Sequence, residues 1–97
     1  MAIRKPPTKG KSLHLFSLNT EYGKYSETLI PYIREISKDI DVFCFQEVPR
    51  DATNTVCFEA GHDPDFYGKL ETILPEFMGY YCEYVRESFG IATFVRK

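Results

Sequence analysis

Two polar residues stand directly behind two apolar segments, and both are of types that handle metal ions and phosphate. Asn19 follows the apolar segment 13–18, and Glu47 follows the apolar segment 42–45 after the intervening Gln46. A carboxylate is a good ligand for Mg²⁺, which prefers oxygen donors and needs only one or two carboxylates when water and substrate phosphate complete its shell. An uncharged amide can donate a hydrogen bond to a phosphate oxygen. The pair therefore indicates metal-assisted chemistry on a phosphate group, if the fold brings the two side chains together.

The segments around these residues predict a strand–helix–strand unit. Segment 13–18 is a short apolar run typical of a buried strand, and segment 42–45 is apolar at every position, which is typical of a strand covered on both faces. Between them, from residue 26 onward, apolar residues recur every three or four positions and share one helical face; they are Leu29, Tyr32, Ile33, Ile36 and Ile40. Ser26 or Thr28 is the expected N-cap of this helix. If Thr28 is the cap, Pro31 falls in the first turn, where its missing N–H costs nothing.

A crossover of this kind makes the two strands parallel, and the connection between them is right-handed. The carboxyl ends of parallel strands lie side by side, which is where open α/β sheets place their ligands. Asn19 and Glu47 are therefore expected at one edge of the sheet. Gln46 should point to the opposite face of the pleat, where it would brace the site or the core.

The rest of the chain predicts a second helix and a strand hairpin. Helical spacing returns over 66–77, and Pro75 limits the length of that helix. Segments 80–86 and 91–96 are rich in strand-forming residues and are separated by a turn at 87–90. The predicted fold class is α+β: strand–helix–strand, helix, strand hairpin.

Length and charge set limits on the kind of protein. The chain has 97 residues, of which 43% are hydrophobic, so one small domain with a modest core is expected over residues 13–97. The net charge is −2, but Arg4, Lys5, Lys9 and Lys11 make residues 1–12 basic, which leaves eight basic against fourteen acidic residues beyond them. This acidic body argues against bulk electrostatic capture of nucleic acid. Residues 1–12 are interpreted as a flexible, solvated leader, with a phosphate-contacting arm as the alternative.

Cysteine content and hydropathy bear on location. The three cysteines, Cys44, Cys57 and Cys82, fit neither a disulfide framework nor a zinc pattern, which favours a reducing compartment. The N-terminus lacks an apolar signal core, and no segment reaches transmembrane length. A soluble intracellular protein, cytoplasmic or nuclear, is the expectation.

Two stretches of the chain resemble the opening of the endonuclease/exonuclease/phosphatase family, whose members have a deoxyribonuclease-I-like fold. Ser17-Leu18-Asn19 and Asp41-Val42-Phe43-Cys44-Phe45-Gln46-Glu47-Val48 are similar to the family's strand ending in Asn and, after one helix, its strand ending in Gln-Glu. The segment Gly90-Ile91-Ala92-Thr93-Phe94-Val95-Arg96 resembles the family's next characteristic strand. The resemblance covers roughly residues 13–97, with the middle loosely matched.

The resemblance implies a fold, a cofactor and residue roles. It makes the chain the N-terminal part of a four-layer α/β/β/α sandwich in a divalent-metal-dependent nuclease or phosphatase. Glu47 would bind Mg²⁺ or Mn²⁺, and Asn19 would position the scissile phosphate. The substrate would be nucleic acid, a phosphorylated small molecule or a lipid head group. The family's later Gly-Asp-x-Asn segment and its final Asp-His pair have no match here, so a C-terminal half of the domain is an expected partner.

Several alternatives stay open on the sequence alone. Glu47 could cap a turn or pair with Arg50, and Asn19 could end its strand with an Asx-turn. The cluster of His62, Asp63 and Asp65 could be a loose metal site, although a turn that caps the second helix is favoured. At the level of the whole chain, the alternative to a hydrolase fragment is a non-catalytic α/β interaction module that uses an exposed sheet edge.

Overall fold

A computed structural model describes residues 12–50, 62–85 and 89–97 of the chain. The predicted basic leader, apart from Ser12, lies outside these residues, as does Cys57. The elements, in chain order, are β1 (Leu15–Asn19), the short 3-10 turn η1 (Glu21–Gly23), α1 (Ser26–Ile36), a second 3-10 turn η2 (Ser37–Asp39), β2 (Val42–Pro49), α2 (Phe66–Ile73), β3 (Phe77–Val85) and β4 (Phe89–Arg96).

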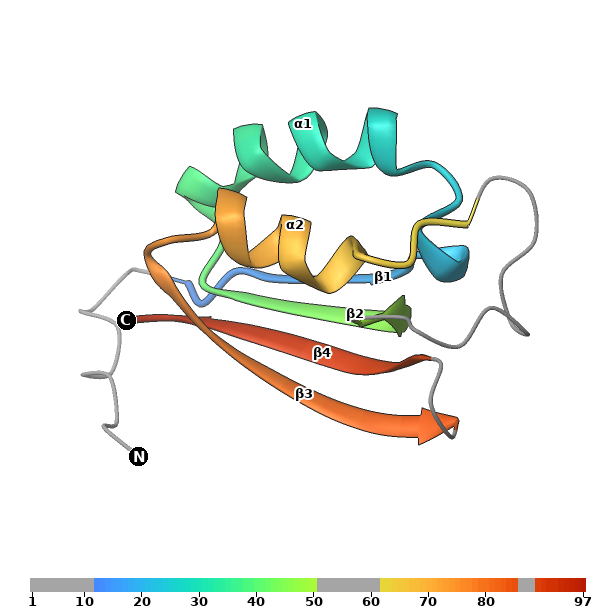
Figure 1. The fold of residues 1–97 in the computed structure, drawn as a ribbon. Helices are drawn as coiled ribbons and strands as arrows, with labels where there is room; N and C mark the ends of the chain where they lie inside the picture. The colour runs from blue at the N-terminus through green and yellow to red at the C-terminus, as the bar shows by residue number, and fades with distance from the viewer. Residues whose placement is uncertain (1–11, 51–61, 86–88) are drawn as a thin grey trace.

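The four strands form one mixed sheet in the order β1-β2-β4-β3 (Figure 1). β1 and β2 are parallel neighbours, and β4 pairs antiparallel with both β2 and β3. The predicted α+β class, the parallel strand–helix–strand unit and the C-terminal hairpin are therefore confirmed. The start of the parallel pair is fixed by backbone bonds from Asp41 and Val42 to the carbonyl of His14, and by the His14 N–H, which donates to the Asp41 carboxylate at 2.9 Å.

Several predicted boundaries are wrong: β3 and β4 begin earlier than the predicted strands 80–86 and 91–96, and three further differences have a local reason. Tyr25 occupies the N-cap position of α1, and neither Ser26 nor Thr28 caps the helix, because the Thr28 and Leu29 N–H groups already donate to the Tyr25 carbonyl. Pro31 consequently lies inside α1. The second helix ends at Ile73 instead of Phe77, since Pro75 cannot continue it and residues 75–76 form a turn.

The third boundary is that of β2. The strand continues to Pro49 instead of stopping after Phe45, with a register shift against β4 between Phe45 and Val48. A β-bulge of this kind inserts an extra residue into one strand without ending it. The Gln46–Glu47 pair therefore lies inside the strand, at a bulge.

Both helices cover one face of the sheet, and the core lies between them and that face (Figure 1). Its centre is aromatic: the Phe43 and Phe45 rings stack with centroids 5.4 Å apart, and Phe45 meets Phe94 edge-on at 6.3 Å. Phe66 and Leu70 of α2 close the core from above and are fully buried. Burial of several aromatic side chains supplies most of the apolar stabilisation available to a chain of this size.

Arg96, at the end of β4, connects the sheet to the turn that follows α1. Its guanidinium donates to the carbonyl oxygens of Ser37 and Ile40 and pairs with Glu76 at 3.2 Å. The same group lies 4.6 Å from the ring centroid of Phe77. One side chain thus donates to two carbonyls at η2, and the Ser37 carbonyl also accepts the Ile40 N–H.

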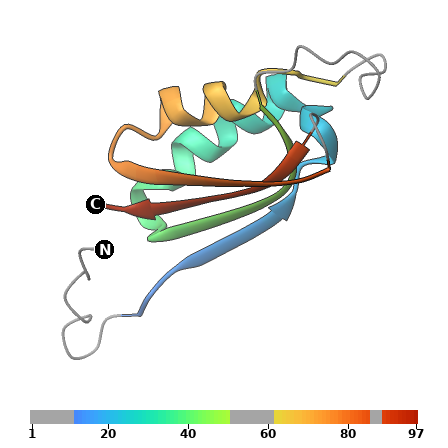
Figure 2. The same ribbon diagram turned by 60° about the horizontal axis from the view of Figure 1, so that its bottom comes forward.

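No helix lies over the opposite face of the sheet in the described part of the chain (Figure 2). Side chains alternate across a strand, so the residues between the buried phenylalanines point to this open face. The register aligns them in rows across all four strands; one row is Leu15, Val42, Val95 and Met78, and the next is Ser17, Cys44, Thr93 and Tyr80. Neither row holds a charged residue, and Leu15 is 62% exposed.

Over the residues that the structure describes, no helix has the length and apolar character needed to cross a membrane. Cys44 and Cys82 are both free thiols.

Candidate functional site

The carboxyl ends of β1 and β2 form the rim that the sequence predicts. Asn19, the last residue of β1, is the register partner of Gln46 in the parallel neighbour β2. The Thr20 N–H then donates to the Gln46 carbonyl at 3.0 Å, which extends the pairing by one residue. Asn19 and Glu47 therefore belong to the same end of the sheet.

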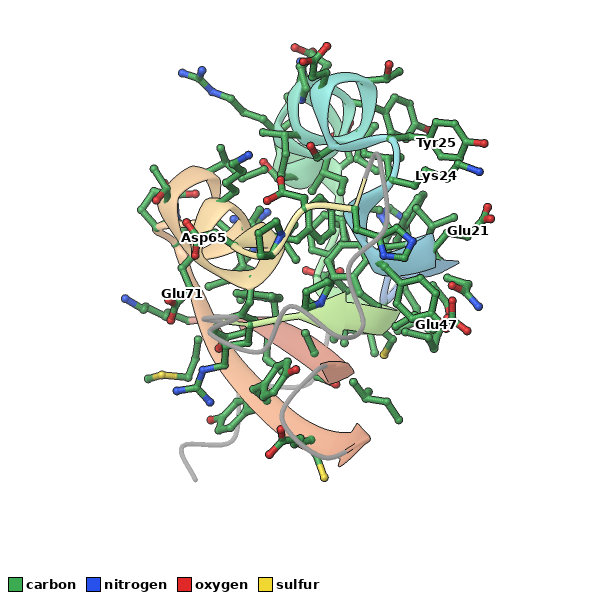
Figure 3. The ribbon with its side chains drawn as sticks, turned by 45° about the vertical axis from the view of Figure 1, so that its right-hand side comes forward. Glu21, Lys24, Tyr25, Glu47, Asp65 and Glu71 are labelled. Carbon is green, nitrogen blue, oxygen red and sulfur yellow. The ribbon has the colours of Figure 1, made fainter. Side chains whose placement is uncertain are left out.

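Glu47 has an unusual backbone conformation. Its φ is +55°, in the left-handed region, and it sits at the bulge between Phe45 and Val48. A residue with a Cβ rarely adopts this conformation, and such outliers cluster at functional sites. Figure 3 shows Glu47, Glu21, Lys24 and Tyr25 on one side of the molecule, whereas Asp65 and Glu71 lie on the other side, at α2.

Asn19 is exposed and ends its strand with a local turn. Its Oδ1 accepts the Glu21 N–H at 2.9 Å, which is the Asx-turn that the sequence left open. This bond orients the amide, because it holds the oxygen end of the side chain toward the backbone of Glu21. The NH₂ end of the same amide is the end suited to donate to a phosphate oxygen.

The turn after β1 brings a second carboxylate to the rim. Glu21, Tyr22 and Gly23 have φ values of +50°, +61° and +73°, a left-handed turn that packs against β2. A Cβ at Gly23 would lie 2.8 Å from the Cβ of Asp63, so only glycine fits there. Sequence reasoning missed Glu21 as a rim residue; the signal available was Gly23, which marks a turn that folds back on the strand end.

The segment before α2 forms a turn, which is the arrangement that the sequence favoured for His62, Asp63 and Asp65. The buried Asp63 accepts the Asp65 N–H at Oδ1, 3.0 Å away, and the Lys69 ammonium at Oδ2, 2.6 Å away. This hydrogen bond raises the pKa of Lys69 above its ordinary value. Asp65 holds the N-cap position of α2 without a side-chain capping bond. The Asp63 carboxylate therefore fixes the loop.

The same segment is attached to the rim turn. The Asp63 N–H donates to the Tyr22 carbonyl at 3.0 Å, and the His62 ring lies with its centroid 4.9 Å from that of Tyr22. The two loops support each other, which places His62 beside the turn that carries Glu21.

Gln46 lies on the open face, where its Nε2 is 3.3 Å from the Ser17 hydroxyl and 3.4 Å from the Cys44 carbonyl. These contacts connect β2 to β1 just before the rim. Arg50 does not pair with Glu47: its guanidinium stacks on the rings of Tyr67 and Tyr81, 5.5 and 5.1 Å from their centroids.

The donors at the rim fit part of a magnesium site. Within residues 12–50, 62–85 and 89–97, no three His, Cys, Asp or Glu side chains are grouped closely enough to hold a metal ion by themselves. Glu47, with Glu21 on the same side of the molecule, supplies one or two carboxylates. That number is sufficient for a hard cation that keeps several waters and takes the remaining ligands from a substrate phosphate.

In comparisons with known proteins, no family model, no curated protein and no solved structure matches this chain.

Proposed function

We propose that this chain forms the first part of a divalent-metal-dependent phosphoester hydrolase of the endonuclease/exonuclease/phosphatase type. One observation carries the proposal: parallel pairing of β1 and β2 sets Asn19 beside the strained Gln46–Glu47 bulge at a single rim. An amide donor and a carboxylate are the two groups that recognition of a metal-bound phosphate requires. The resemblance of both strand ends to the family's opening segments agrees with this arrangement.

Each rim residue has a distinct role in the proposal. Glu47 holds Mg²⁺ or Mn²⁺, and Glu21, on the same side of the molecule, offers a second carboxylate. Asn19 presents its NH₂ to the scissile phosphate, because its oxygen is engaged by the Glu21 N–H. A bound metal would supply the positive charge that stabilises the phosphate and the leaving oxygen. The Asp-His pair that would activate water has no match in this sequence and belongs to the expected C-terminal half.

The open face of the sheet supports the sandwich part of the proposal. Four large hydrophobic side chains of this face are 43–62% exposed: Leu15, Met78, Tyr80 and Ile91. Three of them belong to the two rows that hold no charged residue. A contiguous apolar patch on a folded protein marks a surface that contacts a partner, and a second layer of the same domain is the partner that we propose. A second sheet packed about 10 Å away would complete the α/β/β/α order and bury these side chains.

The test is a Mn²⁺ titration of the ¹⁵N-labelled chain, followed by paramagnetic broadening of its amide signals. Broadening is expected at residues 19–21 and 46–48, and Glu47→Gln should reduce it at least several-fold. Glu71→Gln is the matched control, since Glu71 is an exposed carboxylate at α2 on the other side of the molecule. Both variants remove one charge, so a nonspecific electrostatic effect would be equal in the two.

Equal broadening in Glu47→Gln and Glu71→Gln would refute the assignment of Glu47 as the metal ligand. The coding sequence that follows Lys97 gives an independent check. A Gly-Asp-x-Asn segment and a later Asp-His pair in the same reading frame would support the hydrolase.

The second candidate is a non-catalytic module that binds a partner strand at the edge of the sheet. It is favoured by β1, which is an edge strand of the sheet and carries the exposed Leu15. Added strands bind such edges through main-chain hydrogen bonds. Slower hydrogen exchange of the β1 amides on addition of a partner, without any Mn²⁺ effect at Glu47, would favour this function over the hydrolase.

A further inference from the structure

The left-handed conformation of Glu47 needs a support, because an ordinary strand residue would relax to extended geometry. A strained residue persists only where its surroundings over-determine it. The neighbours of Glu47 along β2 do not provide this, since the ladder with β4 skips the residues between Phe45 and Val48. The support must therefore come from the other side, where β1 ends.

Thr20 makes the contacts that such a support requires. Its backbone N–H donates to the Gln46 carbonyl at 3.0 Å, and its Oγ1 lies 3.1 Å from the Gln46 carbonyl and 3.0 Å from the Glu47 carbonyl. The hydroxyl proton can serve either carbonyl. Both peptide units flanking the Glu47 Cα are thus held by one residue.

The surroundings of Thr20 make this support rigid. The residue is 1% exposed, among the most deeply buried polar side chains of the described chain. It also stands between Asn19 and Glu21, the other two rim residues. Any movement of Thr20 would therefore shift all the groups that the proposed site uses.

We infer that Thr20 is a positioning residue, which fixes the Glu47 carboxylate in the direction of the metal and holds the Asn19 amide beside it. This inference rests on the proposed function for its purpose and on the three contacts of Thr20 for its mechanism. A site with one or two protein carboxylates depends on their orientation, and a loosening of about 1 Å is enough to impair it. Thr20 touches neither substrate nor metal and acts through the backbone of Glu47.

The experiment compares Thr20→Val, Thr20→Ser and Thr72→Val in the full chain. Valine keeps the shape and the backbone N–H of threonine but removes the hydroxyl, whereas serine keeps the hydroxyl. Thr72 is the matched control: it lies on α2, and its hydroxyl donates to the Gly68 carbonyl at 3.0 Å. Two readouts are recorded: the HN–Hα coupling of residue 47, which reports its φ, and Mn²⁺ broadening around it.

Thr20→Val is expected to change the residue 47 coupling and to weaken the Mn²⁺ effect several-fold. Thr20→Ser and Thr72→Val should resemble the wild type in both readouts. Wild-type coupling and broadening in Thr20→Val would overturn the inference. Failure of the proposed function is seen separately, as absence of broadening at residue 47 in the wild type, whatever the coupling shows.

A second variant covers the case in which Thr20→Val does not fold. In Thr20→Val/Glu47→Gly, glycine adopts the left-handed conformation without support, so the chain should recover its dispersed amide spectrum. Recovery supports a role that runs through the backbone of residue 47. If the double variant is also unfolded, Thr20 is a core residue only and the inference is overturned.

Discussion

Replacement of Glu47 by glycine should stabilise the protein relative to replacement by alanine. Both variants remove the carboxylate, so the comparison isolates the backbone at φ +55°. At an ordinary strand position the order is reversed, because glycine loses more conformational freedom on folding than alanine does. The sign of the difference in unfolding free energy therefore reports whether residue 47 is left-handed in solution.

The size of the effect follows from two opposing contributions. An L-residue in the left-handed conformation costs roughly 1–2 kcal/mol because its Cβ approaches the carbonyl oxygen. The extra entropy that glycine loses on folding offsets about 0.5–1 kcal/mol of this gain. Glu47→Gly should consequently be more stable than Glu47→Ala by about 0.5–1 kcal/mol.

Urea unfolding followed by far-ultraviolet circular dichroism measures this difference. For a chain of this size the dependence on urea is of the order of 1–2 kcal/mol per molar, so the midpoints should differ by about 0.3–1 M. Ser17 provides the reference position, since it is exposed and lies in the middle of β1. Ser17→Gly and Ser17→Ala both lose the contact with Gln46, and there alanine should be the more stable variant.

The reasoning is refuted if alanine is more stable than glycine at position 47 by the same amount as at position 17. That result would mean that Glu47 is extended in solution, and the bulge and its support by Thr20 would lose their physical basis.

Three further predictions concern the supports of the fold. Arg96→Met should lower the free energy of unfolding by about 2 kcal/mol, because it leaves carbonyls at the η2 turn without their charged donor; urea midpoints measure this. Tyr81→Phe should cost about 1 kcal/mol in the same assay, since its hydroxyl donates to the Val48 carbonyl at 2.8 Å. The hydrogen bond with Asp63 raises the pKa of Lys69, so the stability that it contributes is full below the ordinary lysine pKa and is lost as pH rises through the raised value. Urea midpoints measured from pH 8 upward should therefore fall more steeply in the wild type than in Asp63→Asn.

The chain offers a matched control for each of these predictions. Arg34→Met, on the exposed face of α1, should change stability by less than about 0.5 kcal/mol. Tyr80→Phe alters a neighbouring exposed ring on the open face and should also have little effect. In Asp65→Asn the urea midpoint should fall at alkaline pH as it does in the wild type. Equal effects of a variant and its control would contradict the contact on which that prediction depends.

The parallel unit was predictable because its signals are strong and local. The largely apolar runs at 13–18 and 42–45, with a periodic segment between them, predict a parallel pair joined by a right-handed crossover, and β1 and β2 pair accordingly. The hairpin of β3 and β4 followed from strand-forming residues on both sides of a turn. Such patterns depend on side-chain periodicity, which the sequence displays directly.

The bulge was not predictable in the same way. The apolar run ends at Phe45, yet β2 continues to Pro49 because the extra residue at the bulge restores the pairing of Val48 with Gly90. The role of Thr20 was equally hidden. A threonine after a strand has no sequence signature for a bond to a carbonyl 26 residues away, which only the pairing of the strands creates.

All residues with positive φ in the described chain lie at the rim: Glu21, Tyr22, Gly23 and Glu47. At position 23 the sequence meets the requirement with glycine, and Asp63 leaves no space for a side chain there. At position 47 the same backbone requirement is met with glutamate, although glycine adopts this conformation without the steric cost of a Cβ. A strain that a single substitution would relieve is expected only where the side chain itself is needed. Glu21 and Tyr22 hold the same conformation with side chains, and the strain at Glu47 supports, independently of resemblance, the proposed role of its carboxylate.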